Sequence, residues 1–324
     1  MVYLITGAAG FIGSNLSHEL IQTGKEVVLV DRFSEYYSSD LKRLRVEALL
    51  NGFEVLNVDL ANRSEVYSKL KNKSFETVFH LGAQPGVRVK FPDSTVYLRD
   101  NISAFSNILE FSIESGAAKF LYASSSSVYE NSSQFPFTET ENLVSPSNMY
   151  AKSKWINEKI AESFLGNNLE ILGLRFFSAY GPWGRPDMSY LRMISSSFSG
   201  QTYFQNGDGS VRRDFTFIDD IVESLIRLSQ RKDYVHPVVN IGGNQDRRMT
   251  DLIKIIETLT GKSMSITNLA SASQDLERTL ADSERLKSLI DYTPNTTLEE
   301  GIGETINWAK KYANDDQLFS WTSV

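Results

Sequence analysis

The chain of 324 residues has no cysteine and carries 33 basic and 40 acidic side chains, which gives a formal charge of −7. The absence of cysteine excludes a disulfide scaffold, a thiolate nucleophile and a cysteine-based zinc site, and because the three histidines are scattered we expect no metal. An acidic chain without a basic cluster binds nucleic acid poorly. No apolar run approaches the roughly 20 residues of a membrane helix. We therefore expect a cytoplasmic protein that binds neither nucleic acid nor a membrane.

Between the N-terminus and Phe177, short apolar runs alternate with amphipathic stretches. The apolar runs predict strands at Val2–Thr6, Glu26–Asp31, Glu54–Val58, Thr77–His80, Lys119–Ser124 and Leu169–Phe177. The amphipathic stretches predict helices at Ile12–Thr23, Leu41–Leu50, Asn101–Ser115 and Tyr150–Phe164. Continuous apolar strands are typical of parallel sheets buried on both faces, and this alternation is typical of α/β folds. We therefore expect a doubly wound parallel Rossmann sheet.

After Phe177 the pattern breaks up into glycine, proline, serine and aromatic residues. A later strand at Val238–Ile241 is expected to return to the main sheet, and helices are expected at Met249–Thr260 and Leu298–Tyr312. We predict a sheet domain at residues 1–177 and a smaller α/β lobe at residues 178–324. Within the second part, residues from about 211 to 245 are expected to return to the sheet.

A glycine-rich turn, Gly7-Ala-Ala-Gly10-Phe-Ile-Gly13, follows the first expected strand and opens a helix. Tight turning, close approach of the backbone to a pyrophosphate and helix–strand packing each favour glycine here, and the helix N-terminus offers N–H groups to phosphate. Asp31 ends the next strand, where a carboxylate accepts hydrogen bonds from ribose hydroxyls and repels a 2′-phosphate, whereas Arg32 beside it could bind that phosphate. We predict NAD as the cofactor, with Asp59 and Leu60 near the adenine.

Tyr150 and Lys154 lie one helical turn apart, a spacing that alone is common on solvated helix faces. An ammonium near a phenol lowers the tyrosine pKa from about 10, so Tyr150 could act as a base near neutral pH. Upstream, a buried strand ends in four serines, Ser124–Ser127, at the sheet edge where ligands collect. We predict that Ser125 hydrogen-bonds the same substrate oxygen as Tyr150, and that at least two of the four serines only end the strand.

The glycine turn, the serine-rich strand end with Val128-Tyr129 and the Tyr150–Lys154 pair together resemble the extended short-chain dehydrogenase/reductase superfamily. More narrowly, the chain from Val2 to about Tyr312 resembles the NAD-dependent nucleotide-sugar epimerases and dehydratases. The resemblance implies a UDP-sugar substrate, bound mainly by the second lobe, and a homodimer formed through the helices at Asn101–Ser115 and Tyr150–Phe164. It also implies further cofactor contacts from Phe11, Ile12, Leu81, Ala83, Gln84, Asn101, Tyr150, Lys154 and Phe177.

The reaction is narrowed by what stands near the active-site serine. In the 4,6-dehydratases of this family an Asp-Glu pair carries the elimination, and Ser126 and Ser127 occupy those positions here. UDP-glucuronate decarboxylases usually carry a glutamate near the serine; none stands among Ser124–Ser127, although Glu130 follows shortly after, where relatives usually have glycine. The resemblance therefore implies 4-epimerisation through a 4-keto intermediate, with Tyr150 and Ser125 moving the C4 hydroxyl proton.

Three segments resemble the UDP-glucuronate 4-epimerases: Asp31–Lys42, His80–Arg88 and Leu174–Met188. A C6 carboxylate needs a hydroxyl and a guanidinium, and Ser178 and Arg185 are the available pair, although a surface ion pair is the alternative for Arg185. The resemblance assigns further substrate contacts to Arg88, Ser126, Arg213, Asp275 and Arg278. Thr279 stands where some relatives have tyrosine.

Other functions stay open at this point. A UDP-glucose or UDP-N-acetylglucosamine 4-epimerase is the closest alternative, ahead of a UDP-glucuronate decarboxylase or a dTDP-glucose 4,6-dehydratase. An NAD-sensing regulator without catalysis is disfavoured because such proteins can lose the Tyr/Lys pair, which this chain keeps.

Overall fold

The computed structural model describes residues 2–86, 93–166, 168–234, 236–270, 276–312 and 321. Within this part of the chain the largest sheet has seven parallel strands in the order β10-β6-β5-β4-β1-β2-β3. The strands are β1 (Val2–Thr6), β2 (Glu26–Asp31), β3 (Val55–Asn57), β4 (Thr77–His80), β5 (Lys119–Ser125), β6 (Glu170–Phe176) and β10 (Val238–Ile241). The strand order reverses between β1 and β4, so the predicted doubly wound parallel sheet is confirmed.

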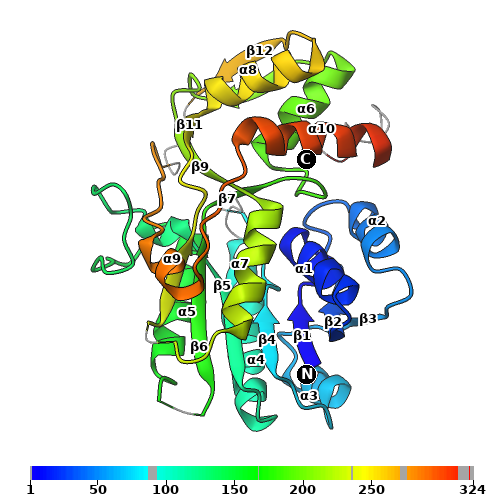
Figure 1. Cartoon of the computed structure of the whole chain (residues 1–324), viewed down its shortest axis with the longest axis vertical. Coiled ribbons are helices and arrows are strands. Elements are labelled where there is room, and N and C mark those ends of the chain that lie inside the picture. Colours follow the sequence, from blue (N-terminus) through cyan, green and yellow to red (C-terminus); the bar gives the residue numbers. More distant parts are fainter. Residues whose placement is uncertain are drawn as a thin grey trace.

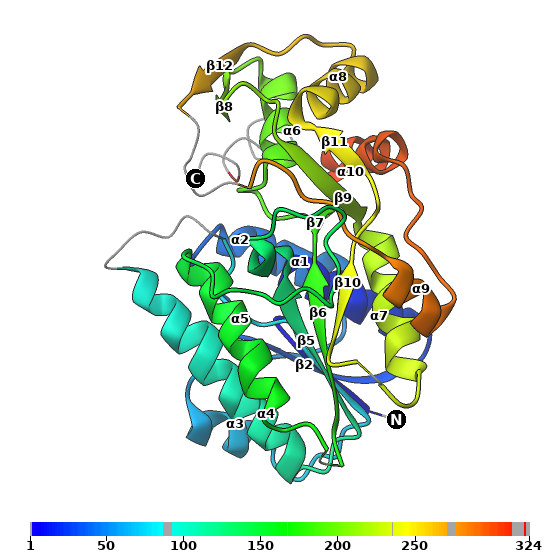
Figure 2. The same cartoon turned by 90° about the vertical axis from the view of Figure 1, so that its left-hand side faces the viewer.

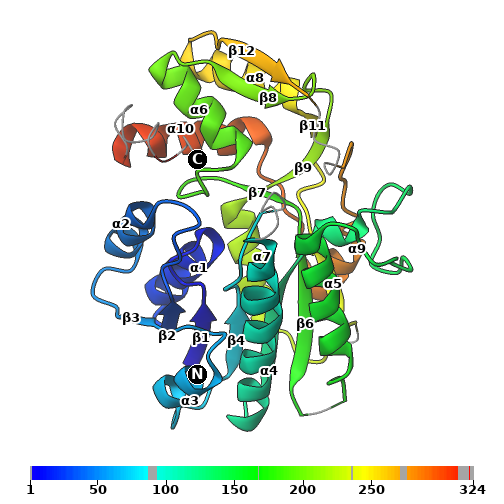
Figure 3. The same ribbon diagram turned by 180° about the vertical axis from the view of Figure 1, so that it is seen from behind.

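Helices cover both faces of this sheet (Figures 1 and 3). One face carries α1 (Phe11–Gln22), α2 (Ser39–Leu49) and α7 (Ile218–Gln230), and the other carries α3 (Arg63–Leu70), α4 (Ala104–Glu114) and α5 (Met149–Glu162). Successive residues of β1 serve the two faces in turn, because Tyr3 and Ile5 belong to one apolar core and Leu4 to the other. None of the described helices has the length and apolarity needed to cross a bilayer.

Most of the remaining elements form a second layer beyond the carboxyl ends of the main strands (Figure 2). A three-stranded sheet has the order β11-β9-β7, and β12 pairs with β8 in a separate parallel pair. The elements of this layer are β7 (Ser178–Tyr180), β8 (Tyr203–Asn206), β9 (Arg212–Phe217), β11 (Asp246–Arg248), β12 (Ile266–Leu269), α6 (Ser189–Ser199), α8 (Met249–Thr260) and α10 (Leu298–Tyr312). The helix α9 (Glu284–Ile290) lies outside this layer, beside the main sheet.

The chain crosses between the two layers more than once. β9 lies in the small sheet, whereas α7 packs against α1 and β10 joins the main sheet beside β6. α9, much later in the chain, also packs against α7 and β10. The division at residue 177 and the return of residues 211–245 stay predictions.

One predicted helix begins differently. The segment predicted as a helix from Asn101 starts as a π-helical turn, η2 (Leu98–Ser103), which then continues into α4. The Asn101 side chain is turned inward, where its amide pairs with the backbone N–H and carbonyl of Gln84 at 2.7 and 3.2 Å. These bonds hold Asn101 against the loop after β4, and a widened turn accommodates them.

Candidate active site

A cavity of about 550 Å³ lies between the carboxyl ends of the main strands and the second layer. Gly7, Gly10 and Asp31 line one end, and Tyr203 and Phe215 line the other. Ser125, Tyr150 and Lys154 line the middle. Its size is that of a small-molecule site, and its position at the carboxyl edge of the sheet is where α/β folds bind ligands.

The glycine turn between β1 and α1 fits a pyrophosphate. Gly7 has a φ of +71°, and a Cβ there would lie 2.8 Å from the backbone nitrogen of Gly82. A Cβ on Gly13 would overlap the carbonyl oxygen of Gly7, so the helix can approach the strand only with glycine there. Gly10 caps α1 without a side-chain hydrogen bond, which leaves the helix N-terminus open to an anion from the cavity.

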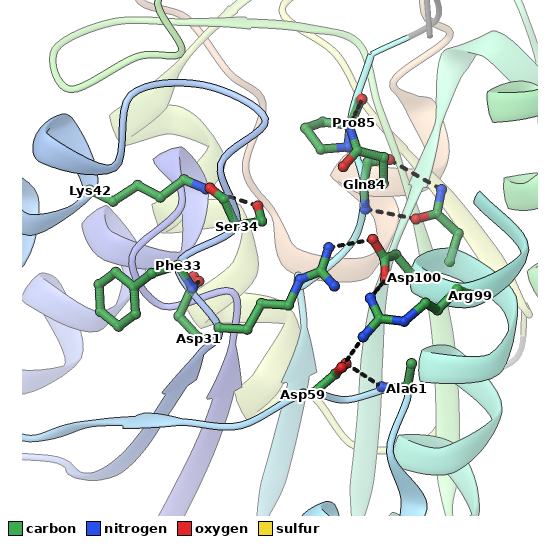
Figure 4. A network of polar contacts seen from close by, with 12 residues as sticks. Asp31, Phe33, Ser34, Lys42, Asp59, Ala61, Gln84, Pro85, Arg99 and Asp100 are labelled. Carbon is green, nitrogen blue, oxygen red and sulfur yellow. Dashed lines mark hydrogen bonds and ion pairs between the residues drawn. The ribbon is translucent and has the colours of Figure 1, made fainter. Parts of the chain in front are cut away.

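Asp31 joins the glycine turn to the end of β2. Its two carboxylate oxygens accept hydrogen bonds from the backbone nitrogens of Ala9 at 3.0 Å and Phe33 at 2.7 Å. Beside it, the Arg32 guanidinium reaches the carboxylate of Asp100 in η2. Figure 4 shows the ion pairs that continue from Asp100 through Arg99. Because a carboxylate holds Arg32, the cation that could have attracted a 2′-phosphate is neutralised, and the site suits NAD.

We expect the Asp100→Asn substitution to weaken this discrimination. Removing the carboxylate releases Arg32, so the ratio of NADP to NAD affinity should rise about tenfold, the equivalent of roughly 1.4 kcal/mol. Dissociation constants of the two dinucleotides, measured calorimetrically on protein stripped of cofactor, give this ratio.

A matched control is Glu110→Gln, which removes the carboxylate of an exposed ion pair with Arg63 on α3 and α4. It should leave the ratio unchanged. An unchanged ratio in Asp100→Asn as well would show that Asp100 does not govern cofactor choice.

Most predicted cofactor contacts line the cavity. Beyond the glycines and Asp31, these are Phe11, Ile12, Arg32, Asp59, Leu60, Leu81, Ala83 and Phe177. Gln84 and Asn101 do not line it. Asn101 instead donates to the Ser153 hydroxyl of α5 at 2.9 Å, so it ties the loop after β4 to the helix that carries Tyr150. A direct cofactor contact from Gln84 and Asn101 stays a prediction.

The structure brings the three predicted catalytic residues together. Tyr150 lies in the first turn of α5, where the Asn148 side chain accepts a hydrogen bond from the Tyr150 nitrogen at 2.9 Å. Ser125 ends β5, and its hydroxyl lies close enough to the Tyr150 phenol to lower the pKa of that phenol. Lys154, one turn further along α5, donates to the carbonyl of Ala123 at 2.9 Å and lies 5.9 Å from the centre of the Tyr150 ring.

Burial and nearby charges act on both Tyr150 and Lys154. Burial raises the pKa of Tyr150, although the tyrosine faces the cavity, and Arg185 and the Ser125 hydroxyl partly offset that rise. Burial also lowers the pKa of Lys154 to about 8, and its ammonium is directed to the Ala123 carbonyl. Arg185 is thus a cation that favours the Tyr150 phenolate, and the effect of Lys154 on that phenol stays a prediction.

A buried ion pair lies behind the catalytic helix. Arg175 of β6 donates to both carboxylate oxygens of Glu158 on α5, at 3.0 and 2.8 Å. The hydroxyl of Ser124 donates to the same carboxylate at 2.5 Å. These contacts fix α5 against β5 and β6, and they place Ser124 among the serines that serve the framework.

The same cavity carries the predicted carboxylate site. Ser126, Ser178 and Arg185 all line it. Arg185 forms a two-pronged pair with Asp187, at 3.1 Å from Nε and 2.5 Å from Nη2. Burial would lower the pKa of Arg185, but the Asp187 carboxylate outweighs it and raises that pKa, so the guanidinium stays charged. Arg185 therefore does form an ion pair, the alternative considered from the sequence, but the pair lines the cavity.

Sequence reasoning missed two residues at this site, Asp187 and Tyr36. A Cβ on Gly86 would overlap the Tyr36 hydroxyl and lie 3.7 Å from Nη2 of Arg185, so these groups converge on the glycine. Tyr36 reaches the site from the loop between β2 and α2. Its position between Asp31 and Lys42, a segment already singled out, was the available signal.

Arg45 of α2 holds the loop that leads to Arg185. It is fully buried, and its guanidinium donates to the carbonyls of Trp183 and Gly184 at 2.8 Å each and to that of Ala9 at 3.1 Å. The hydroxyl of Tyr37 accepts a further bond at 2.6 Å. One side chain thus joins the glycine turn, α2 and the arginine loop.

Replacing Arg45 with methionine should lower the free energy of unfolding by about 3 kcal/mol, because buried carbonyls lose their donor. Urea unfolding followed by circular dichroism measures this. Arg43→Met, an exposed position on the same helix, is the control and should change stability by no more than about 0.5 kcal/mol. Equal losses in both variants would contradict the structural role of Arg45.

The remaining predicted substrate residues are placed unevenly. Arg213 lines the cavity and donates to the Leu276 carbonyl at 2.6 Å, and Thr279 lines it nearby. Arg278 does not line the cavity, because Asp246 holds its Nε at 2.8 Å. Its predicted substrate contact stays a prediction. Two further predicted residues, Arg88 and Asp275, lie outside the described residues.

Known proteins resemble this chain over nearly its whole length. The UDP-glucuronate 4-epimerase of Thermodesulfobacterium geofontis is 34% identical and covers 95% of this chain and 96% of its own. A crystal structure of UDP-glucuronic acid 4-epimerase from Bacillus cereus, in complex with UDP-glucuronic acid and NAD, has a TM-score of 0.89 at 31% identity and covers 96% of this chain and 99% of its own. The UDP-glucose 4-epimerase of Thermotoga maritima with UDP-glucose has a TM-score of 0.86 at 27% identity, covering 97% of this chain and 100% of its own. The model of the NAD dependent epimerase/dehydratase family matches residues 3–242. The family model thus matches about three-quarters of the chain, and the chain belongs to the NAD dependent epimerase/dehydratase family.

Proposed function

We propose that this protein uses NAD to interconvert a UDP-sugar with its C4 epimer, and that the physiological pair is UDP-glucuronate and UDP-galacturonate. The observation that carries the choice of sugar is the position of Arg185, which lines the same cavity as Ser125 and Tyr150 and lies close enough to the Tyr150 phenol to lower its pKa. In a hexuronate the carboxylate carbon is two bonds from C4. A cation that binds the carboxylate must therefore lie close to the base that works at C4.

The residues divide the chemistry as follows. The glycine turn, Asp31 and Lys154 would hold NAD, which would serve as the reversible hydride acceptor for C4. Tyr150 takes the proton of the C4 hydroxyl while Ser125 hydrogen-bonds the same oxygen. Ser178 and Arg185 bind the C6 carboxylate, with the substrate competing with Asp187 for the guanidinium.

The 4-keto sugar turns about its bonds to the pyrophosphate and presents its other face, so that the hydride would return to C4 from that side while Tyr150 returns the proton to the C4 oxygen. Arg213 and the second layer hold the UDP part throughout, so binding energy remote from C4 retains the intermediate. The hydroxyls at Ser126 and Ser127 cannot act as the carboxylic acids of a dehydratase.

The test is to incubate the protein separately with UDP-glucuronate, UDP-glucose and UDP-N-acetylglucosamine and to follow products by proton NMR. Conversion of UDP-glucuronate alone to UDP-galacturonate is the expected result. Preferred conversion of a UDP-sugar without a carboxylate would support 4-epimerisation but contradict UDP-glucuronate as the substrate. A UDP-pentose with release of carbon dioxide would identify a decarboxylase.

We also propose a homodimer that pairs η2, α4 and α5 with their copies. α4 and α5 lie side by side on the outer face of the sheet (Figures 2 and 3). Leu98 of η2 and Leu165 just after α5 are 49% and 47% exposed. Light scattering behind gel filtration should give twice the chain mass of 36.5 kDa. A monomer at micromolar concentration would contradict this arrangement.

The cytoplasmic location expected from the sequence stays a prediction.

A further inference from the structure

Glu130 is an acidic residue of the cavity wall that the proposed chemistry does not use. It directly follows η3 (Ser126–Tyr129), the short helical turn after Ser125. Its backbone is in the right-handed helical region, with φ −45° and ψ −35°, so the residue extends the turn that begins at the active-site serine.

The Glu130 side chain reaches across to the start of α5. One carboxylate oxygen accepts hydrogen bonds from the backbone nitrogens of Ser147 at 3.0 Å and Asn148 at 3.2 Å. The other oxygen accepts a hydrogen bond from the Ser147 hydroxyl. A carboxylate that collects donors in front of a helix N-terminus is also favoured by the helix dipole.

These bonds act on the residue that sets the first turn of α5. Asn148 is the N-cap, and its side-chain oxygen accepts from the nitrogens of Tyr150 at 2.9 Å and Ala151 at 3.3 Å. A path of hydrogen bonds thus runs from the end of the serine turn through Glu130 and Asn148 to the backbone of Tyr150. Along the chain, Glu130 and Ser147 are separated by the loop of residues 131 to 146.

We propose that Glu130 is a positioning residue that sets the separation of the Ser125 and Tyr150 hydroxyls by hydrogen bonding. The proposal rests on the proposed function, in which both hydroxyls must meet one substrate oxygen. Displacements of about 1 Å between reacting groups can cost a factor of about 100 in rate. The role belongs to the hydrogen bonds and does not require Glu130 to exchange a proton.

Two substitutions of Glu130 distinguish positioning by hydrogen bonds from proton transfer. Glu130→Ala removes every acceptor. Glu130→Gln keeps an oxygen for the nitrogens of Ser147 and Asn148, and its amide can donate to the Ser147 hydroxyl, which then acts as the acceptor. We expect kcat with UDP-glucuronate to fall about 30-fold in Glu130→Ala with KM little changed, and to stay within about threefold of wild type in Glu130→Gln with the same pH profile.

Glu141→Ala is the matched control. Its carboxylate accepts hydrogen bonds from the Thr138 nitrogen at 2.9 Å and from the Ser132 hydroxyl. Both partners belong to the loop of residues 131 to 146 and neither belongs to α5. Amide hydrogen exchange supplies a readout without substrate: exchange at Tyr150 and Ala151 should speed up in Glu130→Ala and stay unchanged in Glu141→Ala.

The outcomes are distinct. Wild-type protein without epimerase activity would overturn the proposed function, whatever the variants do. With an active wild type, a Glu130→Ala variant within twofold of it in kcat, or with unchanged exchange at Tyr150, would overturn the positioning role. A Glu130→Gln variant as slow as Glu130→Ala, with one limb of the pH profile lost, would instead make Glu130 a proton-transfer group.

Discussion

Replacing Tyr150 with phenylalanine should lower kcat about 1,000-fold or more, with the affinity for UDP-glucuronate within about twofold of wild type. The phenol is the only group that the proposed chemistry uses to take the C4 hydroxyl proton, and loss of a positioned acid–base group typically costs a factor of 100 to about 10,000. In the proposed complex Arg213 and the second layer bind the UDP part, and Tyr150 acts only at C4, so binding should survive. Turnover is measured by NMR and binding by calorimetry.

The matched control is Tyr97→Phe. The Tyr97 ring lies 6.0 Å from that of Tyr150, and its hydroxyl donates to the Gly86 carbonyl. The same change in a neighbouring tyrosine should leave kcat within about fivefold of wild type. Turnover that survives in Tyr150→Phe would remove this residue from the catalytic step.

Replacing Arg185 with methionine should lower kcat/KM for UDP-glucuronate about 100-fold. A charge-assisted, two-pronged pair with a carboxylate is worth about 3 kcal/mol when partly buried, and methionine keeps the bulk of the side chain without the cation. UDP alone, which has no sugar carboxylate, is the control ligand, and its dissociation constant should stay unchanged. Equal losses for UDP and UDP-glucuronate would show a general disturbance of the cavity.

The same substitution should also move the pH profile. The Arg185 cation offsets part of the rise that burial causes in the pKa of Tyr150. Without that cation the phenolate is less favoured, the pKa of Tyr150 rises further, and the ascending limb of kcat/KM shifts to higher pH. A limb that stays in place would show that Arg185 does not influence the ionisation of Tyr150.

The sequence predicts the main sheet well because each strand is a continuous apolar run bounded by turn residues. Val2–Thr6 and Val238–Ile241 have the same bounds in the structure, although the second joins the sheet only after a long detour. α7 was missed even though Ile218, Ile221 and Leu225 repeat at helical spacing and are buried. The helical spacing is present in the sequence, but it lies in the part of the chain after Phe177, where the overall pattern of strands and helices breaks up.

Other elements could not be predicted from local pattern. β8 and β12 pair across 63 positions. All four residues of β12 are exposed, and in β8 the polar Gln205 is buried while Phe204 is exposed, so neither strand shows an apolar pattern that matches its burial. The π-helical turn before α4 depends on hydrogen bonds between Asn101 and Gln84, which are contacts between separate segments.

The candidate site shows the same division. Glycine spacing, the strand-end carboxylate and the Tyr150–Lys154 pair are local patterns, and the structure gathers them around one cavity. The pairing of Arg185 with Asp187, the approach of Tyr36 and the reach of Glu130 to Ser147 depend on how loops meet in space. Sequence spacing identifies the chemistry-bearing residues, and tertiary contacts decide which charge acts on which group.

The most direct measurement uses UDP-glucuronate that carries deuterium at C4, incubated in ordinary water with the protein and NAD. We predict UDP-galacturonate that keeps its deuterium at C4, because the hydride removed from C4 would return to the opposite face of the same carbon without exchanging with water. Only the hydroxyl proton handled by Tyr150 exchanges with water. A product with protium at C4, or a UDP-pentose in its place, would contradict epimerisation by reversible oxidation at C4.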